Sequence, residues 1–281
     1  MGTVLSSRRA AAEARGIALA SVDRMPVFSP VLGRLVATLG DETISFTHLA
    51  ALIEKDTLLA GHLLRLVNSA IYSRGREVTS VPRAISILGV TRLRNFAVSL
   101  LVARMWSRVR LPQSFSLARF NLHGVATAIA ADLLAQRIPL EYYEGAFAAG
   151  LLHDVGKALV AVSLPEEYDL LARSGAWDAG MEEEVLGVTH AELSRQVLEH
   201  WRLPPPICQA AGEHHTPPSG PPSLAHIIHA ANSFANATSA ATEAGAPMDP
   251  AAFLAPLGIQ NQCESIQSSF AAEFDTLRQF F

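Results

Sequence analysis

The residues with the clearest chemical potential are an adjacent histidine and aspartate, His153 and Asp154, followed by Lys157. Aliphatic residues flank the pair on both sides, so the sequence predicts a hydrophobic helix that carries the pair in its body and buries it. Burying an imidazole and a carboxylate without partners costs considerable free energy. Either other side chains or a metal ion must therefore satisfy them, and the functional interpretation depends on which.

Imidazole groups are concentrated in one part of the chain, because eight of the ten histidines fall between positions 123 and 229. Several lie on segments whose apolar residues recur at helical period. One such helix is predicted over 120–134, and the capping-box pattern that opens with Thr189 places another histidine in a first helical turn. Five helices could bring the following side chains to one point: His123, His153, Asp154, His190, His214, His215 and Asn232.

Each of these residues also has a purely structural interpretation. A single histidine at a helix N-terminus, such as His190, is more often structural than functional, and the pair His214-His215 is a weak signal alone. The joint pattern is stronger, because a core rarely collects so many imidazoles to satisfy only one another. The remaining histidines have no partner pattern and are interpreted as surface or packing residues: His48, His62, His200, His226 and His229.

The elements that must position these side chains are helices. Segments such as 58–67 and 91–106 are apolar at helical spacing, and no segment shows the alternation of a strand between hairpin turns. The predicted fold class is therefore all-α, a multi-helix bundle. Four segments are expected: an N-terminal tail or helix over 1–24, a helical half over 25–112, a half with the histidine cluster over 113–240, and a loop and C-terminal helix over 241–281 that packs on the body.

Composition narrows the class of protein. Of the 281 residues, 49% are hydrophobic and 17% are charged, with a net charge of −4, which argues for a large core and against a dedicated nucleic-acid surface. Two cysteines are too few for a disulfide framework, which fits a reducing cytoplasm. No uncharged apolar run reaches the roughly 18 residues that cross a bilayer. We expect a cytoplasmic protein with no membrane segment.

Several motifs carry a resemblance to a known family. The spacing of His123 from His153-Asp154 resembles the signature of the HD superfamily of metal-dependent phosphohydrolases. A more specific similarity is to its HDOD branch, the HD-related output domains of bacterial signalling proteins. This similarity extends over about residues 25–275, and it rests on Pro26, on segments 53–58, 64–70, 84–89 and 187–204, and on Glu213-His214-His215.

The resemblance implies an HD-like bundle with an N-terminal helical subdomain. Because no receiver, EAL or GGDEF domain accompanies it, the chain resembles a stand-alone HDOD protein. Related HD-GYP phosphodiesterases open cyclic di-GMP with two or three metal ions, whereas HDOD proteins are regarded as non-catalytic signalling modules. In catalytic relatives the lysine equivalent to Lys157 meets a phosphate. Their metal ligands match these positions: His123, His153, Asp154, His190, His214 and His215.

Three departures from the catalytic pattern bear on activity. The aspartate that closes the site in the catalytic relatives corresponds to Asn232, and their glutamate ligand falls at or near Arg119. The Gly-Tyr-Pro loop is replaced by the segment 216–222. Two divalent ions need several carboxylates, so a two-metal hydrolase is disfavoured. One ion is plausible on His123, His153 and Asp154, a set suited to iron, zinc, nickel or manganese, with Asn232 as a weak neutral ligand.

The leading hypothesis is a non-catalytic regulatory module of bacterial signal transduction that binds a signalling protein or a nucleotide second messenger. The alternative is a metal-dependent phosphohydrolase of HD type with a degenerate site, acting on cyclic dinucleotides or nucleotides, with Lys157 as a phosphate contact. A third hypothesis is nucleic-acid binding by a helix pair over 49–67 and the arginines between Arg74 and Arg94. The negative net charge disfavours it.

Overall fold

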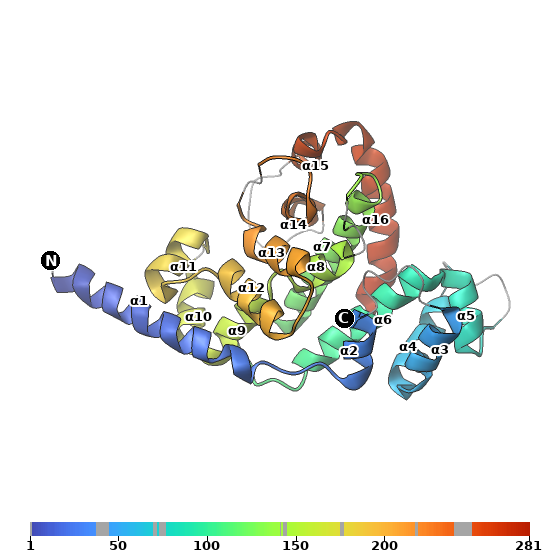
Figure 1. The fold of residues 1–281 in the computed structure, drawn as a ribbon, viewed down its shortest axis with the longest axis horizontal. Coiled ribbons are helices and arrows are strands. Elements are labelled where there is room, and N and C mark those ends of the chain that lie inside the picture. The colour runs from blue at the N-terminus through green and yellow to red at the C-terminus, as the bar shows by residue number, and fades with distance from the viewer. Residues whose placement is uncertain are drawn as a thin grey trace.

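A computed structural model gives the arrangement of residues 2–37, 45–69, 72, 77–140, 142, 145–174, 177–216, 219–238 and 249–281, with side chains from residue 10 onward. Throughout these ranges the regular structure is helical and no strand occurs, which confirms the predicted all-α class (Figure 1). Most of the loop expected from residue 241 onward lies outside the described residues. So do Arg74 and Arg76 of the nucleic-acid hypothesis.

The N-terminal segment is a full helix, α1 (Gly2–Ala20), followed by a short 3-10 turn at Val22–Arg24. It buries Ala14 and Ala18 against the body and packs along α11 and α12 of the histidine-bearing half. Met25, which precedes Pro26, has an extended backbone with φ −63° and ψ 147°. The first segment of the chain is therefore a structural part of the second half.

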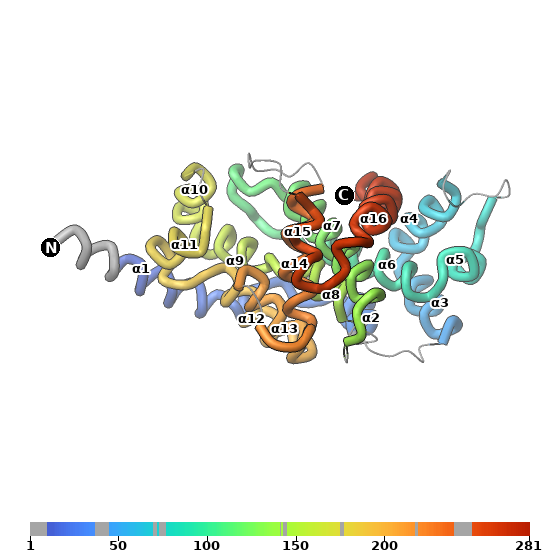
Figure 2. Tube along the Cα trace, turned by 90° about the horizontal axis from the view of Figure 1, so that it is seen from above, coloured from blue at the N-terminus to red at the C-terminus, as the bar shows by residue number. Residues whose placement is uncertain are grey.

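The N-terminal helical half consists of helices that pack on one another at one end of an elongated molecule (Figure 2). Side chains cap two of its helix starts: the Ser45 hydroxyl accepts from the backbone N–H of His48, and the Asp56 carboxylate accepts from that of Leu59. Gly89 adopts a φ of 82° where two helices meet. The helices are α2 (Pro30–Ala37), α3 (Phe46–Glu54), α4 (Thr57–Val67), α5 (Val81–Leu88) and α6 (Val90–Trp106).

The second half carries the histidines and is built around α7, α8 and α14, which pack against one another in the middle of the molecule (Figure 1). The sequence prediction did not include α10, α11 or α15. These helices are α7 (Leu117–Ala135), α8 (Ala146–Leu152), α9 (Val155–Ser163), α10 (Pro165–Arg173), α11 (Ala179–Leu186), α12 (His190–His200), α13 (Pro205–Glu213), α14 (Leu224–Thr238), α15 (Pro250–Leu254) and α16 (Cys263–Leu277).

Two glycine contacts bring the functional helices unusually close. A Cβ on Gly150 of α8 would lie 2.8 Å from the Cα of Ala128 on α7, and a Cβ on Gly156 of α9 would lie 2.0 Å from the carbonyl oxygen of His190 on α12. Only glycine leaves room for such contact between backbones. The first contact joins the helices of His123 and His153, and the second joins those of Asp154 and His190.

One stretch, residues 146–163, is long and apolar enough to cross a membrane by composition, and the bent pair α5–α6 passes the same test if it is counted as one span. The stretch is 83% buried inside the protein, and it contains Asp154 and Lys157. Core helices commonly pass this test, so it is weak evidence for a membrane segment. The expected cytoplasmic location stays a prediction.

Candidate metal centre

The His153-Asp154 pair lies in a break between two helices, because α8 ends at Leu152 and α9 begins at Val155. The expectation that the pair sits in the body of one helix is therefore wrong. Asp154 takes the position that precedes α9, with φ −99° and ψ 11°, and the imidazole of His153 turns back to the carbonyl oxygen of Gly150. The prediction of burial is correct, since His153 is 0% and Asp154 5% exposed.

The carboxylate of Asp154 is the centre of the site, and nitrogens from several helices surround it. Lys157 is one turn further on, and its ammonium forms an ion pair with this carboxylate, which places it beside the site. The distances to Oδ2 are 2.9 Å from Lys157 Nζ, 3.5 Å from His153 Nε2 and 3.6 Å from His123 Nε2, and those to Oδ1 are 3.2 Å from His190 Nε2 and 3.4 Å from His214 Nε2.

Three of these imidazoles are fixed by a hydrogen bond on their outer side. His153 Nδ1 lies 2.7 Å from the Gly150 carbonyl oxygen, and His214 Nδ1 lies 2.6 Å from that of Ala211. A carbonyl oxygen can only accept, so Nδ1 carries the proton in both rings. The third, His190 Nδ1, donates in the same way to a carboxylate oxygen at 2.6 Å. In the neutral rings each Nε2 therefore presents a lone pair to Asp154.

Lone pairs also face one another across the site. Nε2 of His190 lies 3.3 Å from Nε2 of His214, and in the neutral rings both nitrogens carry lone pairs. Nε2 of His215 lies 3.1 Å from Nε2 of His190, and Nε2 of His123 lies 3.2 Å from that of His153; in these two pairs either nitrogen can donate or accept, depending on the tautomers of His215 and His123. Oδ1 of Asp154 is buried and lacks a hydrogen-bond donor. Converging acceptors without protons repel one another unless a cation lies among them. The donor set thus fits a divalent metal ion.

Two groups of ligand atoms meet the distance requirement for a metal, with all atoms within 4.8 Å of one another. One is His123, His153 and Asp154, and the other adds His190, His214 and His215 to the same aspartate. Both groups therefore depend on one carboxylate. Outer hydrogen bonds to carbonyl and carboxylate groups are the usual support of metal-bound histidines, and they are present here.

The electrostatics favour neutral imidazoles at His123 and His153 beside an ionised aspartate. At His190, burial and Lys157 lower the pKa, but hydrogen bonds to Asp154 and Glu182 outweigh them and raise it above its usual value. Burial lowers the pKa of His123 to about 4. Burial alone would raise the pKa of Asp154, but the neighbouring His153 and Lys157 outweigh it and hold that pKa well below its usual range. Neutral imidazole and carboxylate are the protonation states that bind metal ions.

The other predicted positions lie around this centre. Asn232 of α14 is buried, and its side-chain hydrogen bond to His123 acts on the pKa of that histidine. Arg119 is exposed in the first turn of α7, one turn before His123. Neither residue supplies a carboxylate. His215 is exposed at the edge of the cluster.

Sequence reasoning missed two residues that support the cluster from behind. Glu182 of α11 is the carboxylate that binds His190, and it is 0% exposed. Its place in the run Met181-Glu182-Glu183-Glu184 is typical of a solvated helix face, so the sequence carries no signal for it. His229 on α14 lies 2.9 Å through Nδ1 from the carbonyl oxygen of His214. The sequence indicates no partner for His229, whereas the structure places it behind His214.

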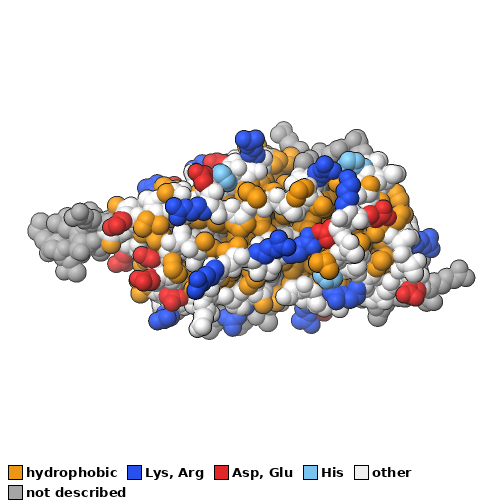
Figure 3. All heavy atoms as spheres, turned by 90° about the horizontal axis from the view of Figure 1, so that it is seen from below, with side chains coloured by type: hydrophobic (Ala, Val, Ile, Leu, Met, Phe, Trp, Pro, Cys, Tyr) orange, Lys and Arg blue, Asp and Glu red, His pale blue; other side chains and the backbone are white. Residues whose placement is uncertain are grey.

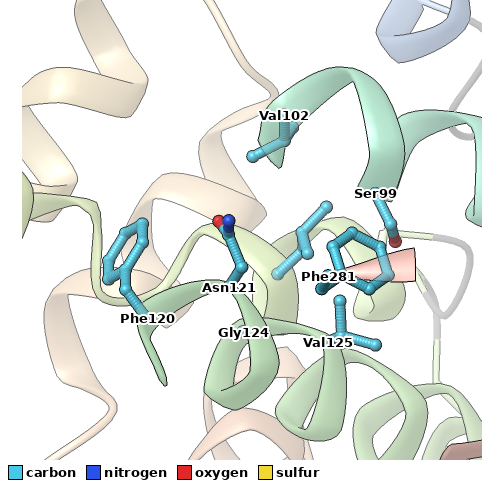
Figure 4. Close-up of a pocket in the computed structure, with 8 residues that line it drawn as sticks. Ser99, Val102, Phe120, Asn121, Gly124, Val125 and Phe281 are labelled. Atoms are coloured by element: carbon cyan, nitrogen blue, oxygen red, sulfur yellow. The ribbon is translucent and has the colours of Figure 1, made fainter. Parts of the chain in front are cut away.

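Two cavities lie outside the histidine cluster in the described part of the chain. The first, of about 10 Å³, has room for roughly one water molecule. Figure 4 shows Phe281 beside Ser99 and Val125 in its lining. The second is an open groove of about 500 Å³ between α1 and α12 that includes Arg15, Glu192 and His200. Neither is lined by a candidate metal ligand.

Comparison with known proteins identifies the family. The model of the HDOD domain matches residues 25–217. An HDOD domain protein of unknown function from Geobacter sulfurreducens superposes with a TM-score of 0.74 and 22% identity, over 95% of this chain and 97% of that one. A Shewanella amazonensis protein, named for an inferred phosphohydrolase activity, gives a TM-score of 0.71 and 23% identity, over 94% of this chain and 96% of that one.

Among curated proteins, an uncharacterized protein of Treponema pallidum (strain Nichols) is 24% identical over 276 residues, which is 90% of this chain and 51% of that protein. The chain thus spans about half the length of this curated relative. At these identities the solved structures establish the fold alone. The family match covers well over half of the residues and includes the centre around Asp154. The chain belongs to the HDOD domain family.

Proposed function

We propose that this protein is a non-catalytic regulatory module of bacterial signal transduction whose histidine cluster holds one divalent transition metal. The observation that carries the proposal is the composition of the donor set, in which a single carboxylate, Asp154, lies among fixed imidazoles. Iron, zinc, nickel and manganese all accept such ligands. The ion would stabilise the junction of the helices that supply its ligands.

Charge argues against a hydrolytic pair of ions. Two divalent ions bring a charge of +4, and only the charge of Asp154 lies among the ligand atoms, while Lys157 adds a positive charge at 2.9 Å. Binding a second ion close to the first would therefore meet strong repulsion. The amide of Asn232 stands where the catalytic relatives have a carboxylate, and it cannot offset that charge.

The proposed output is the binding of a signalling protein partner, with a nucleotide second messenger such as cyclic di-GMP as the second class of ligand. Large hydrophobic side chains are exposed on the N-terminal half, including Val27 at 79% and Leu58 at 64%. Figure 3 shows hydrophobic side chains interleaved with Lys and Arg side chains over one face. Such a mixed surface suits a protein contact.

The test is a turnover assay on protein loaded separately with iron, zinc, nickel and manganese. Cyclic di-GMP and a chromogenic phosphodiester serve as substrates, and Asp154→Ala protein sets the background. We expect every loaded form to match that background while still retaining its metal. Hydrolysis above the background that is lost in Asp154→Ala would overturn the proposal.

A degenerate phosphohydrolase is the second candidate, and the position of Lys157 favours it. Its ammonium lies at the site beside Asp154, where it could also contact a phosphate. A bound ion would supply Lewis-acid activation of water. Lys157→Met separates the candidates: it should abolish hydrolysis if the lysine holds substrate, and should leave the regulatory module's partner binding unchanged.

A further inference from the structure

A buried carboxylate outside the ligand set controls one of its imidazoles. Glu182 on α11 is fully buried, and its Oε1 accepts a hydrogen bond from His190 Nδ1 at 2.6 Å. Its Oε2 accepts from the backbone N–H of the same histidine at 2.9 Å. One carboxylate thus accepts hydrogen bonds from both the ring and the main chain of His190.

The carboxylate is itself held in place by an indole. Trp177 Nε1 donates to Glu182 Oε1 at 2.5 Å, so three N–H groups point at one buried side chain. Burial alone would raise the pKa of Glu182, but these hydrogen bonds outweigh it and lower that pKa. A buried carboxylate with such partners is a fixed negative charge behind His190.

From this geometry we infer that Glu182 is the positioning residue of the centre, which keeps His190 in the tautomer with the proton on Nδ1 and aims Nε2 at Asp154. The inference deepens the proposed function and rests on it where metal affinity is concerned. The carboxylate also makes the imidazole a stronger base, so it raises metal affinity without touching the ion. Trp177 donates to the same carboxylate, so its fluorescence emission should change when His190 binds a metal ion.

The Glu182 variants are chosen so that each removes a defined part of the hydrogen bonding between this side chain and His190. Glu182→Ala removes every acceptor. Glu182→Gln keeps one oxygen, which can still accept from His190 Nδ1, but its NH₂ faces the backbone N–H of His190 and cannot accept. Glu184→Gln is the matched control, because that glutamate is exposed on the same helix. Far-ultraviolet circular dichroism and thermal melting verify that each variant folds.

The first readout is metal affinity, measured by competition with a chromophoric chelator. Removing such an outer carboxylate typically costs about 10–100-fold in affinity. We expect Glu182→Ala to lose about that much, Glu182→Gln to lose less, and Glu184→Gln to match the wild type. The metal-dependent change in tryptophan emission should disappear in Trp177→Phe. Equal affinity in wild type and Glu182→Ala would overturn the inference.

The second readout does not need metal, so it separates this inference from the proposed function. Long-range ¹H–¹⁵N NMR reports the tautomer of His190 in chelator-treated protein at about pH 9, well above the usual imidazole pKa near 6.5. We expect the Nδ1–H form in wild type, in Glu184→Gln and in Glu182→Gln, whose remaining oxygen still accepts from Nδ1, and its loss in Glu182→Ala. An unchanged tautomer in Glu182→Ala would refute the inference. If the wild type bound no metal, but its Nδ1–H form were still lost in Glu182→Ala, only the proposed function would be contradicted.

Discussion

At the residue scale, the centre is explained by which atoms carry protons. The backbone carbonyls of Gly150 and Ala211 hold Nδ1 of His153 and His214, so the opposite nitrogens present lone pairs to Asp154. The residue types and their convergence could be predicted from the sequence. The sequence shows where each histidine is, and the helical period indicates the face of the helix on which its side chain lies. The carbonyl partners and Glu182 could not, because any residue offers a carbonyl and a Glu-rich helix usually faces solvent.

Asn232 limits the site because its amide is neutral where a carboxylate would carry a negative charge. Asn232→Asp adds a buried negative charge next to His123, so we expect metal affinity to rise by about tenfold or more, equivalent to about 1.4 kcal/mol or more. Isothermal titration calorimetry with zinc measures the change. Asn261→Asp, at an exposed position outside α14, is the control and should have little effect. Unchanged affinity in Asn232→Asp would mean that Asn232 lies too far from the ion to ligate it.

At the scale of elements, the centre depends on close helix crossings and on a break in one helix. The sequence pattern of α8 and α9 is continuous, so it predicted one helix and missed the break at His153-Asp154. The spacing of hydrophobic residues indicates which face of a helix is buried, but it does not show where the helix breaks and the chain changes direction. The prediction of a helix start succeeded at Thr189, because capping is a local interaction between neighbouring residues.

The crossing of α9 and α12 at Gly156 brings Asp154 beside His190, and it tolerates no side chain. In Gly156→Ala the new Cβ would meet the backbone of His190, so we expect a loss of about 1–3 kcal/mol or more in the free energy of unfolding, together with weakened metal binding. Urea denaturation measures the first and chelator competition the second.

Gly61→Ala is the matched control for this prediction. Gly61 lies inside α4, is exposed, and a Cβ there would have no heavy atom within 4 Å. This change should raise stability by up to about 1 kcal/mol, because alanine is the better helix former. If Gly156→Ala did not lower the free energy of unfolding relative to Gly61→Ala, the close contact between α9 and α12 at Gly156 would be contradicted.

The ion pair of Asp56 with Arg104 joins the start of α4 to α6 and predicts a pH dependence. The Arg104 guanidinium holds the pKa of the Asp56 carboxyl below its usual value. A lowered pKa means that the pair stabilises the folded state above pH 3.8, and that this stability is lost as pH falls through the folded-state pKa. The pair is partly exposed, so its contribution is about 1 kcal/mol or less.

Asp56→Asn isolates the pair, because asparagine keeps the helix cap at Leu59 while removing the charge. Urea midpoints of wild type and Asp56→Asn should differ near neutral pH and converge as the pH is lowered below that pKa. A difference that stayed constant over this range would show that the lost stability is not electrostatic.

At the scale of the whole molecule, the C-terminus connects the two halves. α16 packs on α7 of the histidine-bearing half, and Phe280 just beyond it contacts Phe96 of α6 with ring centroids 5.0 Å apart. The guanidinium of Arg65 on α4 lies 4.6 Å from the Phe280 ring centroid. The sequence predicted a last helix packing on the body. It could not predict against which half the final aromatic residues pack. The spacing of apolar residues shows that a face is buried, but not which surface it contacts.

Phe280→Ala tests this connection. The ring is half-buried, so we expect a loss of about 2 kcal/mol, less than the roughly 3–5 kcal/mol of a fully buried phenylalanine. Hydrogen exchange should accelerate in α4 and α6 and change little in α12. Gln279→Ala, at the exposed neighbouring position, should leave exchange unchanged. Faster exchange throughout the protein would mean that Phe280 stabilises the fold globally instead of holding the two halves together.

The measurement that tests the central claim most directly is elemental analysis of untagged protein, purified without chelator, beside His153→Ala protein prepared in parallel. The account predicts about one transition metal ion per chain in the wild type and its loss in His153→Ala, because that ring is buried at the centre and faces Asp154. A wild type that neither carries nor takes up metal, or one that holds two ions per chain, would contradict it.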